Sequence, residues 1–356
     1  MDSIRQLAVL KDKKGFALVY VALLIPVLFG FVGLAVDVGH LYVVRGELQN
    51  AADATALAGA WSLYRDPSNP GALPTLDWER ARTAAINFVQ ENKSGGTALA
   101  DATIEVGYWP PLNPADPLST VSTSPSQVPA VRATISRSAG NNGGPVGLFF
   151  MKILDPTKVS APVSSRPAVA TSGFPGSVTP NLLFPMALSK CMTDDIFSRP
   201  PADWPNPINI NSPYGPGGAE CSSGQWTSFK LDSNSVPTIR DLMRDGNPDP
   251  LAIGDDIWIE PGAEATLFQT NKWIPPLPAG GIDVVMAIVD TENTDLKTKG
   301  ERTITGFATF HIDGTDATGA DKYIFGHFIA YSETYPLGIS PGGPTSNIVS
   351  PPQMVQ

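Results

Sequence analysis

Few residues of this 356-residue chain are suited to chemistry. The three histidines are His40, His311 and His327, and the two cysteines are Cys191 and Cys221. Zinc sites combine such residues at short, regular spacings, and the spacings here match no zinc module. The sequence also lacks GxSxG, HExxH, a P-loop, and GxGxxG followed by a suitable helix. We therefore predict that the protein is not an enzyme, has no catalytic residues and binds no cofactor.

Two loops are rich in Asp and Gly, namely DGNPDPLAIGDD at 245–256 and DGTDATGAD at 313–321. Extracellular calcium sites use such oxygen-rich loops, in which Gly permits a tight turn. Neither loop follows the EF-hand pattern, and Asp and Gly are also ordinary turn residues. Asp313, Asp316 and Asp321 are therefore calcium candidates, with ordinary turns as the favoured alternative. We predict no other metal site.

Cys191 and Cys221 both lie well after the most apolar segment of the chain. In an oxidising compartment they are disulfide candidates, and a bridge that closes a loop of about 30 residues contributes roughly 3 kcal/mol. The alternative is a pair of unbonded, buried thiols. The choice depends on where the apolar segment places the rest of the chain.

That apolar segment runs from Phe16 to Val36 and contains no charged side chain. A helix of roughly 20 apolar residues crosses the hydrocarbon core of a bilayer, so we predict a transmembrane span here. Asp37 is the first charge after it, and an amphipathic helical pattern then continues to Tyr64. We predict one continuous helix over residues 15–64, on the order of 70 Å long at about 1.5 Å per residue.

Small residues and a proline interrupt the predicted span. Pro26 removes one backbone hydrogen bond and is expected to kink the helix, which membrane helices tolerate. Gly30 and Gly33 allow another helix to approach closely, although their spacing of three residues differs from the GxxxG motif. These residues predict only a general tendency to pack against a neighbour.

Residues 1–14 form a leader in which basic residues outnumber acidic ones. The positive-inside rule places this leader in the cytoplasm and everything after Val36 outside. A secretory signal peptide, cut near the Ala-rich segment around Ala51, is the alternative. The apolar run is longer than the roughly 7–15 residues of a signal core, which favours a retained anchor.

The junction Lys13-Lys14-Gly15-Phe16 resembles the processing site of type IV prepilins. The resemblance implies cleavage after Gly15, which would make Phe16 the mature terminus; retention of the leader is the alternative. Pilin-like proteins usually carry a Glu five residues into the mature helix, and Tyr20 occupies that position here. This departure favours an assembly factor or anchor over a filament subunit.

Beyond the helix, changes of pattern divide the chain into parts, and the fold class is predicted to be α+β. Residues 65–174 mix helical and alternating patterns, which predicts a small α+β domain, with GGPVGLFFMKIL (143–154) as a short apolar helix. Residues 175–334 contain short β-like runs between turn residues, which predicts a β-rich domain, either a sandwich or a partly open barrel. Residues 335–356 are rich in Pro, Gly and Ser and predict a flexible tail.

The composition limits the kinds of partner. The net charge is −10, with 24 Lys and Arg against 34 Asp and Glu. Nucleic-acid-binding proteins usually present a basic face, and no basic cluster occurs after the leader, so we predict no nucleic-acid partner. The expected partners are a membrane, crossed once, and other proteins.

Residues 14–60 resemble the N-terminal region of TadG-like (TadE/TadG-like) proteins of the tight-adherence, or Flp pilus, machinery. The resemblance rests on Gly15, Pro26, GLAVD (33–37), LY (41–42), LQNAADA (48–54) and ALAGA (56–60). It implies a single-span protein of the bacterial inner membrane, with its N-terminus in the cytoplasm and most of the chain periplasmic or extracellular. It also implies a role in assembling or anchoring a thin adhesive pilus, with pilus-assembly or pilin-like proteins as partners.

The part of the helix beyond the span offers a surface for such partners. NAADATALAGA (50–60) carries small side chains that allow close helix packing, against partner helices or against the protein's own domain. Asp37 is interpreted as a charged stop at the membrane surface; the alternative is that it sets register with partner helices. The partner-helix candidates are Asp37, Arg45, Glu47, Asn50 and Asp53.

Two further functions remain open, together with that of a minor pilin-like filament subunit. The β-rich domain is the basis for a membrane-tethered binding module for glycan, cell wall or another surface. Its tryptophans, either sugar platforms or core residues, are Trp204, Trp226, Trp258 and Trp273. A membrane-anchored hydrolase would require a deep pocket with convergent carboxylates.

Overall fold

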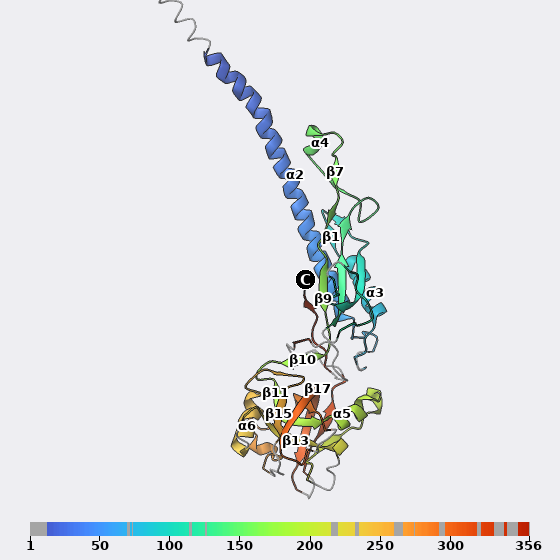
Figure 1. The fold of residues 1–356 in the computed structure, drawn as a ribbon, viewed down its shortest axis with the longest axis vertical. Helices are drawn as coiled ribbons and strands as arrows, with labels where there is room; N and C mark the ends of the chain where they lie inside the picture. The colour runs from blue at the N-terminus through green and yellow to red at the C-terminus, as the bar shows by residue number, and fades with distance from the viewer. Residues whose placement is uncertain are drawn as a thin grey trace, which may run out of the picture.

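The computed structural model describes residues 13–69, 72, 74–113, 116–124, 127–214, 220–231, 235–259, 266–273, 275–291, 296–318, 322–330, 338–339 and 348–355, with the backbone alone at 13–17, 220, 272 and 338–339. The molecule is elongated (Figure 1). A long helix leads into a middle domain, and a C-terminal domain follows at the far end from the helix N-terminus. The architecture is α+β, as the sequence predicts.

Helix α2 spans Lys13–Trp61 without interruption, and Pro26 lies inside it. By length and composition it is apolar enough to cross a membrane. Most of its apolar half extends beyond the folded domains, while its C-terminal half packs on the middle domain (Figure 1). Ala51, Ala52, Ala56 and Ala60 are buried there, because small side chains let the sheet and a second helix approach closely.

The middle domain is an antiparallel sheet with strand order β20-β9-β4-β3, and α2 packs against β4 and β9. The strands are β3 (Thr103–Trp109), β4 (Val128–Thr134), β9 (Ala168–Thr171) and β20 (Gln353–Met354). Helix α3 (Trp78–Val89) packs on α2 and β3. It begins after Asp77, whose carboxylate accepts the backbone N–H of Arg80 at 2.9 Å, an N-cap interaction.

A β-ribbon, which we call the arm (residues 136–164), leaves the middle domain and runs beside α2 (Figure 1). Strands β5 (Ser136–Arg137) and β8 (Val163–Ser164) pair at its base, and β6 (Val146–Gly147) pairs with β7 (Ser160–Ala161) nearer its end. We call residues 148–159 the tip; it contains the four-residue helix α4 (Met151–Leu154). A hairpin of β1 (Lys93–Ser94) and β2 (Thr97–Ala98) lies near the arm's base and also contacts α2.

The prediction of a helix over residues 143–154 is wrong except at α4. Gly143 and Gly144 have φ of 77° and 84°, a left-handed backbone that ends any helix there. Val146 and Gly147 then pair as a strand. The apolar run was therefore a strand and a loop that end in one helical turn.

The C-terminal domain contains a seven-stranded sheet with order β12-β18-β17-β15-β13-β11-β16. An additional pairing joins β16 to β17, so five of these strands close into a ring. Trp226, Phe229, Phe307 and Phe310 are among its largest fully buried side chains. Its strands are β11 (Leu183–Ser189), β12 (Ile208–Asn211), β13 (Gly224–Phe229), β15 (Asp256–Ile259), β16 (Ile282–Val289), β17 (Gly300–Asp316) and β18 (Tyr323–Phe328).

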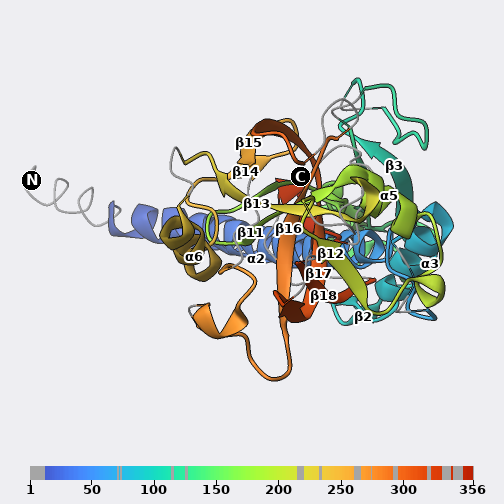
Figure 2. The same ribbon diagram turned by 90° about the horizontal axis from the view of Figure 1, so that it is seen from below.

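Helices α5 (Lys190–Phe197) and α6 (Val236–Asp245) flank these strands on opposite sides (Figures 1 and 2). A small sheet of β14 (Leu251–Ala252), β10 (Pro175–Val178) and β19 (Gly338–Ile339) faces the middle domain (Figure 1). The remaining short elements are the 3-10 turns η1 (Pro201–Asp203), η2 (Glu220–Ser222) and η3 (Thr270–Lys272).

The C-terminal residues differ from the predicted flexible tail. Ile348 is buried in the core of the C-terminal domain, and Val349 is buried in the core of the middle domain. Strand β20 then pairs with β9, and Ser350 N donates to Gly173 O at 2.8 Å. The chain therefore crosses between the two domains twice, once near Gly173 and once near Val349, and residues 348–355 are part of the packed structure.

Candidate functional site

The apolar half of α2 is exposed on nearly every side. Leu18, Leu28 and Phe29 are 74%, 57% and 71% exposed, and Val36 at the end of the run is 46% exposed. Large apolar side chains that the chain itself does not bury are typical of a surface that contacts another apolar environment, such as a bilayer. Gly15 and Phe16 lie in the same helix, at positions where only the backbone is described.

Gly30 and Gly33 face the tip of the arm rather than a separate helix. A Cβ atom added to Gly33 would lie 2.7 Å from Cβ of Phe150, so this position has no room for a side chain. A Cβ on Gly30 would lie 3.8 Å from Leu154 Cδ2. Pro26, Gly30 and Leu154 line one shallow apolar groove.

Asp37 is bonded to the same tip. Its carboxylate accepts the backbone N–H groups of Phe149, Phe150 and Met151 at 2.7, 3.0 and 2.6 Å. The side chain is 2% exposed, and the ring of His40 lies 5.2 Å from that of Phe149. Asp37 therefore joins α2 to a segment more than one hundred residues later, a contact that neither sequence-based interpretation of this residue included.

The other partner-helix candidates divide into bonded and exposed residues. Glu47 Oε2 accepts the N–H of Gly95 at 2.6 Å, and Asp53 accepts from Gln49 at 2.8 Å. Arg45 and Asn50 are exposed. The structure thus places two of the five candidates at the accessible surface of the stem.

A shallow groove on the stem includes Arg45. Tyr42, Arg45, Gln49 and Arg166 line it, and Tyr42 is 70% exposed. The backbone N–H of Arg166 donates to Gln49 Oε1 at 2.9 Å, which fixes one wall of the groove. The groove combines an aromatic side chain with two guanidinium groups, a composition common in protein interfaces.

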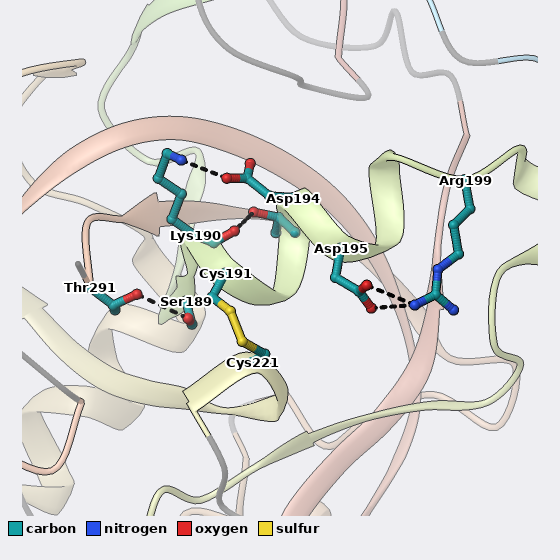
Figure 3. Close-up of a disulfide and its surroundings, with 9 residues drawn as sticks. Ser189, Lys190, Cys191, Asp194, Asp195, Arg199, Cys221 and Thr291 are labelled. Atoms are coloured by element: carbon teal, nitrogen blue, oxygen red, sulfur yellow. Dashed lines mark hydrogen bonds and ion pairs between the residues drawn. A yellow bond between two sulfur atoms is a disulfide. The ribbon is translucent and has the colours of Figure 1, made fainter.

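Cys191 in α5 and Cys221 in η2 are joined by a disulfide (Figure 3). Ser189, just before α5, hydrogen-bonds Thr291 through the two hydroxyls at 3.2 Å. On the helix, Asp195 pairs with Arg199 at 2.6 Å. The disulfide ties α5 to the loop before β13, far from α2, so its role is in the C-terminal domain alone.

The calcium candidates do not converge in the described part of the chain. The N–H and hydroxyl of Thr318 donate to Asp316 and lower its pKa, which is the geometry of an ordinary Asp turn. Asp313 lies 3.5 Å from both His311 and His327. Asp321 lies outside the described residues. Among the described residues no group of His, Cys, Asp and Glu has an arrangement that could hold a metal ion.

His311 and His327 are neighbours, which the sequence did not predict. They are directly paired across β17 and β18, with ring centroids 4.9 Å apart. Asp283 on β16 is opposite His311 and lies 2.5 Å from its Nδ1. Two histidines sixteen positions apart fit a hairpin register, but only the length of the intervening turn decides which residues face each other.

The four candidate tryptophans occupy different environments. Trp226 and Trp273 are buried in the core, and Trp204 packs half-buried against Phe197. Trp258 lines a groove of about 510 Å³, and Lys299 Nζ lies 5.4 Å from its ring centroid. The charged side chains that also line this groove are Lys230, Asp256, Lys299 and Glu301.

Two family models match the chain. Residues 15–62 match the Tad family (Flp pilus-assembly TadE/G-like), and residues 58–162 match the Tad_C family (Tad-like Flp pilus-assembly). No curated protein and no solved structure matches the chain. The matched segment runs from α2 through α3, β3, β4 and most of the arm. Over residues 15–162 the chain is therefore similar to the TadE/G-like Flp pilus-assembly families.

Proposed function

We propose that the protein is a non-enzymatic, single-span envelope protein that assists the assembly or anchoring of a tight-adherence (Flp-type) pilus. The observation that carries the proposal is the division of α2. Its first half exposes large apolar side chains on all sides, and its second half is built into a folded domain. Both halves lie within the Tad family match, so anchor and stem belong to the part that resembles pilus-assembly proteins.

The proposed location is the bacterial inner membrane, with the N-terminus in the cytoplasm and the domains on the periplasmic or extracellular side. The basic leader supports this orientation through the positive-inside rule. The disulfide between Cys191 and Cys221 supports it independently, since structural disulfides persist outside the reducing cytosol. The leader and the disulfide thus support the same location for the C-terminal domain.

The proposed contact for pilus proteins is the exposed strip of the stem around Tyr42, Arg45 and Asn50. This strip begins one to two helical turns beyond Val36, where a neighbouring helix leaving the same membrane would run alongside. Because Glu47 and Asp53 are bonded within the chain, they contribute less to this surface than Arg45 and Asn50.

A crosslinking experiment in cells tests the proposal. In Arg45→Cys and Asn50→Cys, the introduced thiol is the only free one, because the two native cysteines are joined. We expect a thiol crosslinker to capture a pilin-like or pilus-assembly protein from these positions. Val121→Cys, an exposed position (69%) in the middle domain, is the matched control and should capture none. Recovery of free monomer alone from all three variants would contradict the proposed contact.

The state of the N-terminus separates anchor from filament subunit. Mass spectrometry of the purified chain would show a mature terminus at Phe16 if the prepilin-like junction is cut, and an intact leader if it is not. A minor filament subunit would also be recovered in pili sheared from the cell surface. We expect the chain to remain in the membrane fraction, in keeping with Tyr20 at the position where pilins carry Glu.

A second candidate function is a membrane-tethered binding module, which the groove at Trp258 favours. A half-exposed indole beside two lysines and two carboxylates can stack on a sugar ring and hydrogen-bond its hydroxyls. Full-length protein with Trp258→Ala should then lose retention on glycan or peptidoglycan. Trp204→Ala, which changes a tryptophan that does not line this groove, is the control.

A further inference from the structure

The tip of the arm exposes an unusual concentration of apolar surface. Phe149, Phe150, Ile153 and Leu154 are 54%, 43%, 73% and 59% exposed, and Val159 at the other end of the tip is 55% exposed. The two most exposed large apolar side chains elsewhere in the described part of the middle domain, Leu112 and Val121, line a separate small hollow. An apolar patch of this kind normally meets another apolar phase.

The tip lies beside the apolar run of α2. The ring of Phe149 is level with His40, the Cβ of Phe150 touches Gly33, and Leu154 lies beside Gly30 and Pro26. Gly30 is seven residues before Asp37, which corresponds to about 10 Å along a helix. The tip therefore extends past Asp37, the first charged residue after the apolar run, and lies along the segment that is proposed to lie in hydrocarbon.

Hydrogen bonds and close packing hold the tip at this depth. The carboxylate of Asp37 accepts three consecutive N–H groups at the start of the tip. These are backbone groups that would otherwise be unpaired, and unpaired N–H groups are costly in a membrane. The absence of a side chain at Gly33 lets the backbone of α2 contact Phe150 directly. These hydrogen bonds and this contact together attach the tip to the helix.

The charged residues of the tip are Lys152 in α4 and, in the loop between α4 and β7, Asp155 and Lys158. Lys152 and Lys158 are exposed, and Asp155 is occupied by the N–H and hydroxyl of Thr157. A lysine among apolar side chains at a membrane interface extends its ammonium to headgroup level. Anionic phosphates of the headgroups are the matching charge.

From these observations we propose that the tip, residues 148–159, is a second membrane-inserted element. It buries Phe150, Ile153 and Leu154 among the acyl chains of the outer-facing leaflet, with Phe149, level with His40, at the interface. The protein then holds the membrane at two places, a span and a shallow wedge about 5–10 Å deep, as amphipathic interfacial helices do. Two fixed attachments set the tilt and height of the stem, whereas a stem held by a single helix could rotate about the helix axis. This inference rests on the proposed membrane span of α2.

The test measures the surroundings of a single thiol in the full chain, reconstituted in vesicles of phosphatidylethanolamine and phosphatidylglycerol. The variants are Ile153→Cys in the tip, Leu112→Cys as an exposed site on the same side of the membrane, and Val32→Cys in the span. Leu112 is 79% and Val32 is 61% exposed, so none of the three substitutions removes a core contact. The reagents are a membrane-impermeant maleimide and a lipid with a nitroxide on its acyl chain, which quenches a fluorophore attached to the thiol.

We expect Ile153→Cys to react with the maleimide at least about tenfold more slowly than Leu112→Cys, because a thiolate is disfavoured in hydrocarbon. We also expect the lipid nitroxide to quench a fluorophore at residue 153 and at residue 32, and not at residue 112. Reaction of Ile153→Cys within that factor of the control overturns the proposal. Protection without quenching by the lipid also overturns it, since a protein, such as a second copy, would then cover the tip.

The control in α2 separates this inference from the proposed function. If the fluorophore at residue 32 is quenched and the one at residue 153 is not, the membrane span of α2 is supported and the insertion of the tip is contradicted. If neither is quenched, the membrane anchor itself is wrong, and the wedge fails with it. Both results are distinct from the expected one.

Discussion

The two halves of α2 belong to one uninterrupted helix, yet their side chains follow opposite rules. Between Leu18 and Val36 the helix carries large apolar residues, and nearly all are exposed. Between Val44 and Ala60 it carries alanines, polar residues and a few large side chains, and its apolar stripe is buried by the sheet and α3. The first half leaves its apolar side chains exposed, as the proposed membrane span requires, whereas the second half buries its apolar stripe within the fold.

The change between the two halves occurs at Asp37. Among the described residues, the tip of the arm contacts the helix on the N-terminal side of Asp37, and the middle domain packs on one face of it on the C-terminal side. A charged residue at a membrane exit would ordinarily face water. Here the carboxylate accepts hydrogen bonds from three backbone donors, so the boundary between the exposed and the docked half is a structural joint.

Matched leucines in the two halves give the largest expected difference. Leu48 is fully buried and Leu28 is 57% exposed. Leu48→Ala should lower the free energy of unfolding of the middle domain by about 2–5 kcal/mol, because it leaves a cavity between α2 and the sheet. Leu28→Ala should leave that free energy unchanged. Urea unfolding in detergent micelles measures both, and equal losses would mean that the two halves do not differ as described.

Asp37→Ala tests the joint itself. Removal of the carboxylate leaves the N–H groups of Phe149, Phe150 and Met151 without an acceptor, so their hydrogen exchange should accelerate by about tenfold or more. Asp53→Ala removes a carboxylate that is bonded only to a neighbouring side chain on the same helix, and is the control. Exchange in the tip that is the same in both variants would show that Asp37 does not hold the arm.

The sequence predicted α2 well because the signal is local. A charge-free apolar run and an Ala-rich helical pattern need no knowledge of the rest of the chain. The role of Asp37 was not predictable in this way, since its donors lie at residues 149–151 and a single sequence gives no register between distant segments. The arm was missed because GGPVGLFFMKIL has the apolar content of a helix, whereas its first two glycines adopt a positive φ.

The C-terminal domain shows the same limit. Short alternating runs correctly predicted a β-rich region, but ring closure depends on the pairing of β16 with both β11 and β17. One of these pairings is parallel and the other antiparallel, and neither follows from strand spacing. In the tail, two apolar residues among prolines and glycines are too few to predict a packed segment. Ile348 is nevertheless buried in the core of the C-terminal domain, and Val349 in the core of the middle domain.

Two glycines of the stem offer a smaller test of how closely the domain approaches the helix. A Cβ on Gly59 would lie 2.8 Å from Val131 Cγ1, whereas a Cβ on Gly46 would meet nothing within 4 Å. Gly46→Ala should stabilise the protein by up to about 1 kcal/mol, through helix propensity alone. Gly59→Ala gains the same term but overpacks the contact, and a net loss of about 1 kcal/mol is expected. Thermal unfolding compares the two, and stabilisation by both would mean that the docked face is looser than described.

The smallest expected effect concerns a polar contact on the docked half. Glu47 accepts the N–H of Gly95 in the hairpin of β1 and β2, while Arg45 two residues earlier is exposed. Glu47→Gln keeps an acceptor oxygen but removes its charge, so the loss in unfolding free energy should be about 0.5 kcal/mol. Arg45→Gln should cost less than this in stability, yet it should weaken capture of a pilus protein by a crosslinker at Asn50. If Glu47→Gln reduced that capture while Arg45→Gln did not, the partner surface would lie on the hairpin side of the stem, and the exposed strip proposed here would be the wrong face of α2.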